Sequence, residues 1–178
     1  LLKNIEANKF ETDLQFFPLA LSNKNGVIPM YGASTGASLI DGWAGQRNRY
    51  LVPTLKFDRI AKSLVNSKSC LVLIDIEGAE LNCLKGANTL IKSSENNVFL
   101  IEITVGHHQP SGISTNPNLV ETFNLMFSYG YNAFTANKKL RKIEISEVTK
   151  VSSTKVDTIR AYNFIVTKHA DILKKIKF

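Results

Sequence analysis

Residues 71–80 read Leu-Val-Leu-Ile-Asp-Ile-Glu-Gly-Ala-Glu, an apolar run that ends abruptly in acidic residues and a glycine. Four consecutive aliphatic residues predict a strand that is buried on both faces, as inside a parallel sheet. A helical pattern follows directly. Because ligands in open α/β sheets bind beyond the carboxyl ends of the strands, Asp75 and Glu77 stand where a site is expected.

Length and composition predict one domain over residues 1–178. The chain is 44% hydrophobic, enough for one well-packed core and marginal for two. Its two cysteines, Cys70 and Cys83, suit buried, reduced thiols better than a disulfide. A signal peptide and an apolar run of about 18 residues are both missing from the sequence, so we expect a cytoplasmic protein without a transmembrane segment.

The positive charge is concentrated in the last third of the chain. Residues 137–178 contain eleven Lys/Arg and four Asp/Glu, an excess of seven that equals the formal net charge of +7. Such a segment suits nucleic acid or another anionic partner, or is simply a solvated surface. The basic residues are not interleaved with aromatic residues of the kind that stack on bases. The oligomeric state is not indicated by the sequence.

The order of the predicted elements indicates the fold class. Strands are predicted at 14–21, 27–31, 51–55, 71–76, 98–103, 131–135 and 161–167, and helices at 1–8, 58–64, 79–92, 117–129 and 170–177. Strands and helices alternate over most of the chain, which favours an α/β fold with a doubly wound, mostly parallel sheet. Residues 32–45 form a long loop of small residues, and its length suggests a functional segment.

A known family shares these segments in the same order. The acidic block 73–80, the stretch Leu84-Lys85-Gly86-Ala87 and the segment 99–103 together resemble the signature of FkbM-type methyltransferases. Residues 18–22, 34–39 and 57–60 are similar to upstream segments of that family, so the resemblance spans about residues 1–102. It implies a Rossmann-like class I methyltransferase fold that uses S-adenosylmethionine. It also implies O-methylation of a hydroxyl on a sugar or small metabolite.

The same resemblance implies two further strands before residue 1. The family's glycine-rich cofactor loop and its ribose-binding acidic residue follow those strands, and neither motif occurs in this sequence. Both strands would lie between the strands predicted at 14–21 and 71–76, where their absence would leave unpaired backbone groups. We therefore expect the chain to be the C-terminal two-thirds or more of a longer domain. The alternative is a remnant that cannot bind the cofactor normally.

Three residues are candidates for catalysis. We expect partial burial to raise the pKa of Asp75, which suits it to accept a proton or to bind the cofactor's amino group. Glu102 ends the neighbouring strand and would meet Asp75 across the cleft, around a divalent cation or in a simple salt bridge. His107 lies in the following loop, as a general base or without any role.

The cofactor site is expected at two strand ends. Ala20, Leu21 and Ser22 end the strand that contacts adenine in the family, and Asp75 and Glu77 lie at the other side of the cleft. A divalent metal is possible, but the sequence does not identify a set of ligands for one. The competing function is a non-catalytic module of the same fold that binds RNA or another anionic partner through the basic last third.

Overall fold

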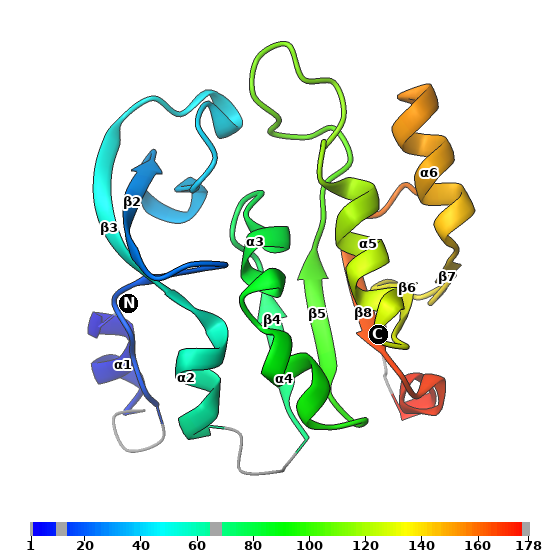
Figure 1. Cartoon of the computed structure of the whole chain (residues 1–178), viewed down its shortest axis with the longest axis horizontal. Coiled ribbons are helices and arrows are strands. Elements are labelled where there is room, and N and C mark those ends of the chain that lie inside the picture. Colours follow the sequence, from blue (N-terminus) through cyan, green and yellow to red (C-terminus); the bar gives the residue numbers. More distant parts are fainter. Residues whose placement is uncertain (1, 10–13, 65–68, 176–178) are drawn as a thin grey trace.

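The computed structural model describes residues 2–9, 14–64 and 69–175. Figure 1 shows helices packed in front of a sheet, with a smaller sheet beside them and a long loop above the sheet. In chain order the elements are α1 (Leu2–Asn8), β1 (Ala20–Ser22), β2 (Gly26–Tyr31), β3 (Arg49–Lys56), α2 (Phe57–Leu64), β4 (Leu71–Ile74), α3 (Glu80–Lys85), α4 (Asn88–Ser93), β5 (Val98–Glu102), α5 (Leu119–Ser128), β6 (Asn132–Thr135), β7 (Lys142–Ile143), α6 (Ile145–Thr154) and β8 (Asn163–Thr167). Short 3-10 turns cover Ser34–Gly36 (η1), Trp43–Gly45 (η2) and Ala170–Lys175 (η3).

The described strands form two sheets of mixed direction. The smaller has the order β1-β3-β2 and the larger the order β4-β5-β8-β6-β7. Only the β1–β3 and β4–β5 pairs are parallel, and the other pairs in the two sheets are antiparallel. The expectation of a mostly parallel sheet is therefore wrong for the described residues, because β8 runs antiparallel to both β5 and β6, and β7 returns antiparallel to β6.

The two sheets end where the sequence predicts a gap. β1 lies at one end of the smaller sheet and β4 at one end of the larger sheet, and the two strands do not pair. A single doubly wound sheet is thus not formed by the part of the chain that the structure describes. The prediction that two further strands belong between β1 and β4 stays a prediction.

β4 is buried on one face only, although its sequence predicts burial on both. Val72 and Ile74 are in the core, whereas Leu71 is 77% exposed and Leu73 is 68% exposed. The face that carries Val72 is covered by helices, and the cluster around η3 on the opposite face includes residues of β5, β6 and β8 but none of β4. An apolar run indicates which residues can be buried, but packing against other elements decides which of them are buried.

One large core lies between the larger sheet and its helices. Phe99 of β5, Phe123 of α5 and Phe164 of β8 are almost completely buried in it. The Phe123 and Phe164 rings meet edge to face with centroids 5.1 Å apart, a favourable aromatic geometry. This packing fixes β5 beside β8, and with it the position of Glu102 at the end of β5.

Several predicted elements differ from the observed ones. The strand predicted at 14–21 is reduced to β1, and the predicted helix 170–177 is the 3-10 turn η3 where it is described, up to residue 175. The segment between the last two predicted strands, for which the sequence predicts no element, contains β7 and α6. The predicted helix 79–92 is divided into α3 and α4 at Gly86 and Ala87.

Long-range contacts explain the division of that helix. The side chain of Asp58 accepts hydrogen bonds from the backbone N–H groups of Thr89 and Leu90, which caps the start of α4. Gly86 lies against β1, so closely that a Cβ there would be 2.0 Å from the carbonyl oxygen of Ser22. Residues distant in sequence thus end one helix and begin the next.

Gly86→Ala is expected to lower the free energy of unfolding by about 1–3 kcal/mol, the usual cost of overpacking. The clash is with a backbone oxygen, so β1 or α3 must shift to relieve it. Urea denaturation followed by Trp43 fluorescence measures the change. Gly36→Ala is the control, because its Cβ would meet nothing closer than 3.7 Å. Equal stability changes in the two variants would contradict the predicted contact.

Neither cysteine forms a disulfide. Cys83 is buried, and burial raises the pKa of its thiol to about 12, so it stays protonated. Cys70 is only partly buried, which corrects the expectation that both thiols are enclosed. Within the described ranges, every helix is too short or too polar to cross a bilayer.

Candidate functional site

The acidic block forms a tight turn between β4 and α3. Glu77 has a φ of 55° and Gly78 a φ of 92°, so two successive residues adopt left-handed backbone. Such a conformation is costly for Glu77 and persists only where surrounding contacts hold it. The buried hydroxyl of Ser38 supplies one such contact, because it donates a hydrogen bond to the carbonyl oxygen of Glu77. The small-residue loop therefore fixes the acidic turn.

Trp43 covers this turn from the same loop. Its side chain is only 2% exposed, and its indole Nε1–H donates a 2.7 Å hydrogen bond to Oε2 of Glu77. A Cβ on Gly78 would lie 2.5 Å from the indole ring, so only glycine permits this close approach. The contact orients the Glu77 carboxylate.

Glu102 and Asp75 meet at the ends of neighbouring strands, as their positions predicted. Burial raises the pKa of the Glu102 carboxyl, and the charges of Asp75 and Glu77 and a hydrogen bond with Asp75 raise it further. Asp75 itself is exposed, so the expected partial burial of this residue is wrong. Asp75 follows β4, which lies at the end of the larger sheet, and no described strand covers that edge of β4.

Glu80 is the buried member of this group. Its side chain is 4% exposed, and its Oε1 accepts a 2.9 Å hydrogen bond from the backbone N–H of Gly78. Burial raises the pKa of Glu80 to about 7, although backbone hydrogen bonds oppose the shift. We call Asp75, Glu77, Glu80 and Glu102 the acidic cluster. The burial of Glu80 depends on Trp43 and on the end of β5, so no local sequence pattern reveals it.

The two loop histidines have different surroundings. His108 lies beside the acidic cluster, since its charge lowers the pKa of Glu102 and its ring centroid is 6.2 Å from that of Trp43. The ring of His107 instead faces Tyr162, with centroids 6.2 Å apart. The backbone N–H of Ala44 donates a 2.7 Å bond to the carbonyl of His108 and joins the two loops above the sheet. The catalytic role of His107 stays a prediction.

The end of β1 lines a separate pocket of about 410 Å³. Ser22 contributes to its wall with Tyr31, Leu39 and Asn82, whereas Ala20 and Leu21 are not among the residues that line it. Leu39 follows Ser38, whose hydroxyl binds Glu77, so one loop connects this pocket to the acidic cluster. The structure thus brings the two halves of the predicted cofactor site to neighbouring positions.

The carboxylates of the acidic cluster favour the binding of a positively charged group. Among the described residues no Lys or Arg forms an ion pair with any of its four carboxyl groups. The described residues also contain no group of three or more metal-ligating side chains arranged to hold an ion. Inside the cluster, the space bounded by Trp43, Glu80 and Thr104 has no room for a water molecule, so a ligand would approach from the exposed side at Asp75.

Comparison with known proteins gives one match. The family model described as "Methyltransferase FkbM domain" matches residues 4–133, well over half of the chain. This range contains the acidic block, Glu102, the loop histidines His107 and His108, and the small-residue loop. Searches of curated proteins and of solved structures returned no significant match.

Proposed function

Since the chain belongs to the FkbM methyltransferase family, we propose that it is an S-adenosylmethionine-dependent O-methyltransferase. Its substrate would be a hydroxyl group on a sugar or another small metabolite. The observation that carries this proposal is the acidic cluster, with Glu102 and Asp75 hydrogen-bonded at adjoining strand ends and the pKa of Glu102 raised. A base with a raised pKa at that edge suits removal of a hydroxyl proton.

The acidic cluster and the pocket at Ser22 have the chemistry needed to bind part of the cofactor. S-adenosylmethionine carries a sulfonium and an ammonium, and the acidic cluster offers carboxylates that no described Lys or Arg neutralises. Asp75 and Glu77 would hold the cationic part, and the pocket at Ser22 would hold the adenine. When bound, the cofactor supplies an electrophilic methyl group.

Glu102 is the proposed general base. Its carboxylate would accept the proton of the acceptor hydroxyl, which makes the oxygen more nucleophilic. Glu77 is held by the indole of Trp43, and this bond keeps its charge fixed beside Glu102. The joined loops above the sheet, which carry Trp43 and His108, would limit the access of water to the reacting oxygen.

We also propose that this chain belongs to a larger methyltransferase domain. β1 and β4 lie at the ends of separate sheets, and Leu71 and Leu73 present an uncovered apolar face. Two strands with their helices would join the sheets and cover that face. The glycine-rich cofactor loop would then follow the first of these strands.

Asp75→Asn is expected to weaken S-adenosylmethionine binding by about 10- to 100-fold, the loss of one hydrogen bond to a charged group. The dissociation constant is measured by calorimetry. The protein used includes any sequence that precedes residue 1 in its gene. Glu6→Gln removes an exposed carboxylate from α1 and should leave the dissociation constant unchanged. Undetectable cofactor binding by the wild-type protein would refute the proposed function.

A further inference from the structure

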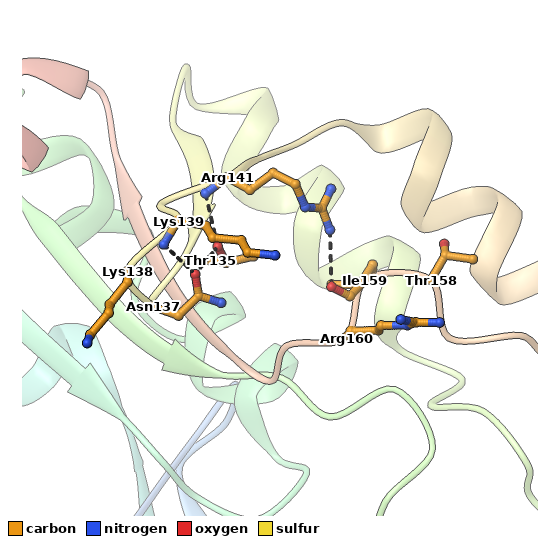
Figure 2. A pocket seen from close by; sticks show the side chains of 8 residues that line it. All are labelled: Thr135, Asn137, Lys138, Lys139, Arg141, Thr158, Ile159 and Arg160. Atoms are coloured by element: carbon orange, nitrogen blue, oxygen red, sulfur yellow. Dashed lines mark hydrogen bonds between the residues drawn. The ribbon is translucent and has the colours of Figure 1, made fainter. Parts of the chain in front are cut away.

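A second pocket lies at the same edge of the larger sheet as the acidic cluster. It has a volume of about 470 Å³ and lies between the turn after β6 and the segment 158–160. The buried side chains of Thr135 and Ile159 form part of its wall. Figure 2 shows the side chains of Lys139 and Arg141 extending toward Ile159, whereas Lys138 points the other way.

Two cations of this pocket, Lys139 and Arg160, are available to a ligand. Within the described ranges, neither Lys139 nor Arg160 forms an ion pair. Arg141 is held across the pocket, since it donates to Glu147 at 2.6 Å and to the carbonyl of Ile159 at 3.1 Å. Two acidic residues, Glu147 and Asp157, lie beside the three cations Lys139, Arg141 and Arg160, so a positive excess remains. This excess suits an anion.

Hydrogen bonds among its own residues fix the turn that forms the pocket. The side-chain oxygen of Asn137 accepts hydrogen bonds from the Thr135 hydroxyl at 3.1 Å and the Lys139 backbone N–H at 3.0 Å. The Thr135 hydroxyl in turn accepts a 3.0 Å bond from the backbone N–H of Arg141. A turn fixed by its own side chains loses little further entropy when it binds a ligand.

The strand register connects this pocket to Glu102. Asn163 of β8 pairs with Glu102 of β5, and its carbonyl accepts a 2.8 Å hydrogen bond from the backbone N–H of Ala136. Ala136, Asn163 and Glu102 therefore lie in one row across the sheet, with about 10 Å between its ends. A smaller hollow of about 200 Å³, lined by Ala136 and Tyr162, lies along this row.

We propose that the basic pocket binds the phosphate group of a phosphorylated small-molecule methyl acceptor, whose hydroxyl then reaches Glu102. This inference rests on the proposed function for the role of Glu102. The distance of about 10 Å between the ends of this row is similar to the length of a sugar phosphate. A pocket of this size with a few clustered cations favours one compact anionic group over a nucleic-acid strand, which needs a continuous basic track. Two other lysines of the last third are paired with acidic residues, Lys142 with Glu144 and Lys168 with Glu95.

Titration with glucose 1-phosphate, glucose and inorganic phosphate tests the proposal. We expect calorimetry to detect glucose 1-phosphate and inorganic phosphate, but not glucose. Lys139→Ala and Arg160→Asn should each weaken phosphate binding at least fivefold. Asparagine is chosen because residue 160 has a φ of 53°, which asparagine tolerates. Lys150→Ala is the matched control: it removes an exposed lysine of the same basic third outside the pocket, and binding should not change.

Three results would overturn the proposal. The first is an absence of phosphate binding by the wild-type protein. The second is an equal loss in the Lys150 control. The third is tight binding of a 20-nucleotide RNA that depends equally on Lys139 and Lys150, since that indicates an extended nucleic-acid surface. Parallel titration with S-adenosylmethionine separates the two proposals. Phosphate binding without cofactor binding would refute the proposed methyltransferase function. Cofactor binding without phosphate binding would refute the proposed phosphate site.

Discussion

Glu102→Gln is expected to lower kcat for methyl transfer by about 10²- to 10⁴-fold, the usual contribution of a positioned general base. Glutamine keeps the size of the side chain and its hydrogen-bonding capacity but cannot accept the hydroxyl proton. Burial and the neighbouring carboxylates raise the pKa of Glu102. The wild-type rate should therefore rise with pH as this group ionises, and the variant should lose that rise.

Two measurements distinguish loss of the base from loss of structure. The dissociation constant for S-adenosylmethionine should change less than threefold in Glu102→Gln, because Asp75 and Glu77 are the proposed contacts to the cofactor. Glu121→Gln, on the exposed side of α5, serves as the control and should keep the wild-type kcat. A Glu102→Gln enzyme that retains a third or more of the wild-type kcat would rule out Glu102 as the base.

Glu80 should make the protein less stable as the pH rises from about 4.5 to 7. At lower pH its carboxyl is protonated in both the folded and the unfolded chain, so it imposes no penalty. Between these values the unfolded chain loses the proton, whereas burial holds the folded pKa at about 7. The free energy of unfolding then falls by about 3 kcal/mol in total and levels off above pH 7.

Glu80→Gln should remove this dependence on pH. The amide does not ionise, and its oxygen can still accept the hydrogen bond from the Gly78 N–H. The variant should match the wild type near pH 4.5 and exceed its stability by about 3 kcal/mol at pH 8, measured by urea denaturation. Glu6→Gln on α1 is the control and should follow the wild-type curve. Parallel curves for wild type and Glu80→Gln would show that Glu80 is not buried as described.

The sequence alone identified the strand-to-helix turn at Asp75 and the position of Glu102. Both follow from local patterns: an apolar run ends in acidic residues, and a second run ends in a glutamate. The family resemblance is confirmed by the match over residues 4–133. Neighbouring parallel strands end at the same edge of a sheet, so the meeting of Asp75 and Glu102 was predictable before any coordinates.

Other features depend on contacts that no local pattern records. The burial of Glu80, the bond from Trp43 to Glu77 and the break at Gly86 all involve partners from distant segments. The prediction of partial burial for Asp75 failed for the same reason. Accessibility depends on what packs against a residue, and the described part of the larger sheet ends at β4.

Sequence by itself therefore determined the family, the order of most elements and the acidic strand ends, because these depend on residues close together in the chain. Tertiary structure decided which carboxyl is buried, which face of β4 is exposed, and that Lys139 and Arg160 line one pocket. Burial and charge proximity arise from packing between segments far apart in sequence. These two properties raise the pKa of Glu102 and give the pocket at Lys139 its positive charge.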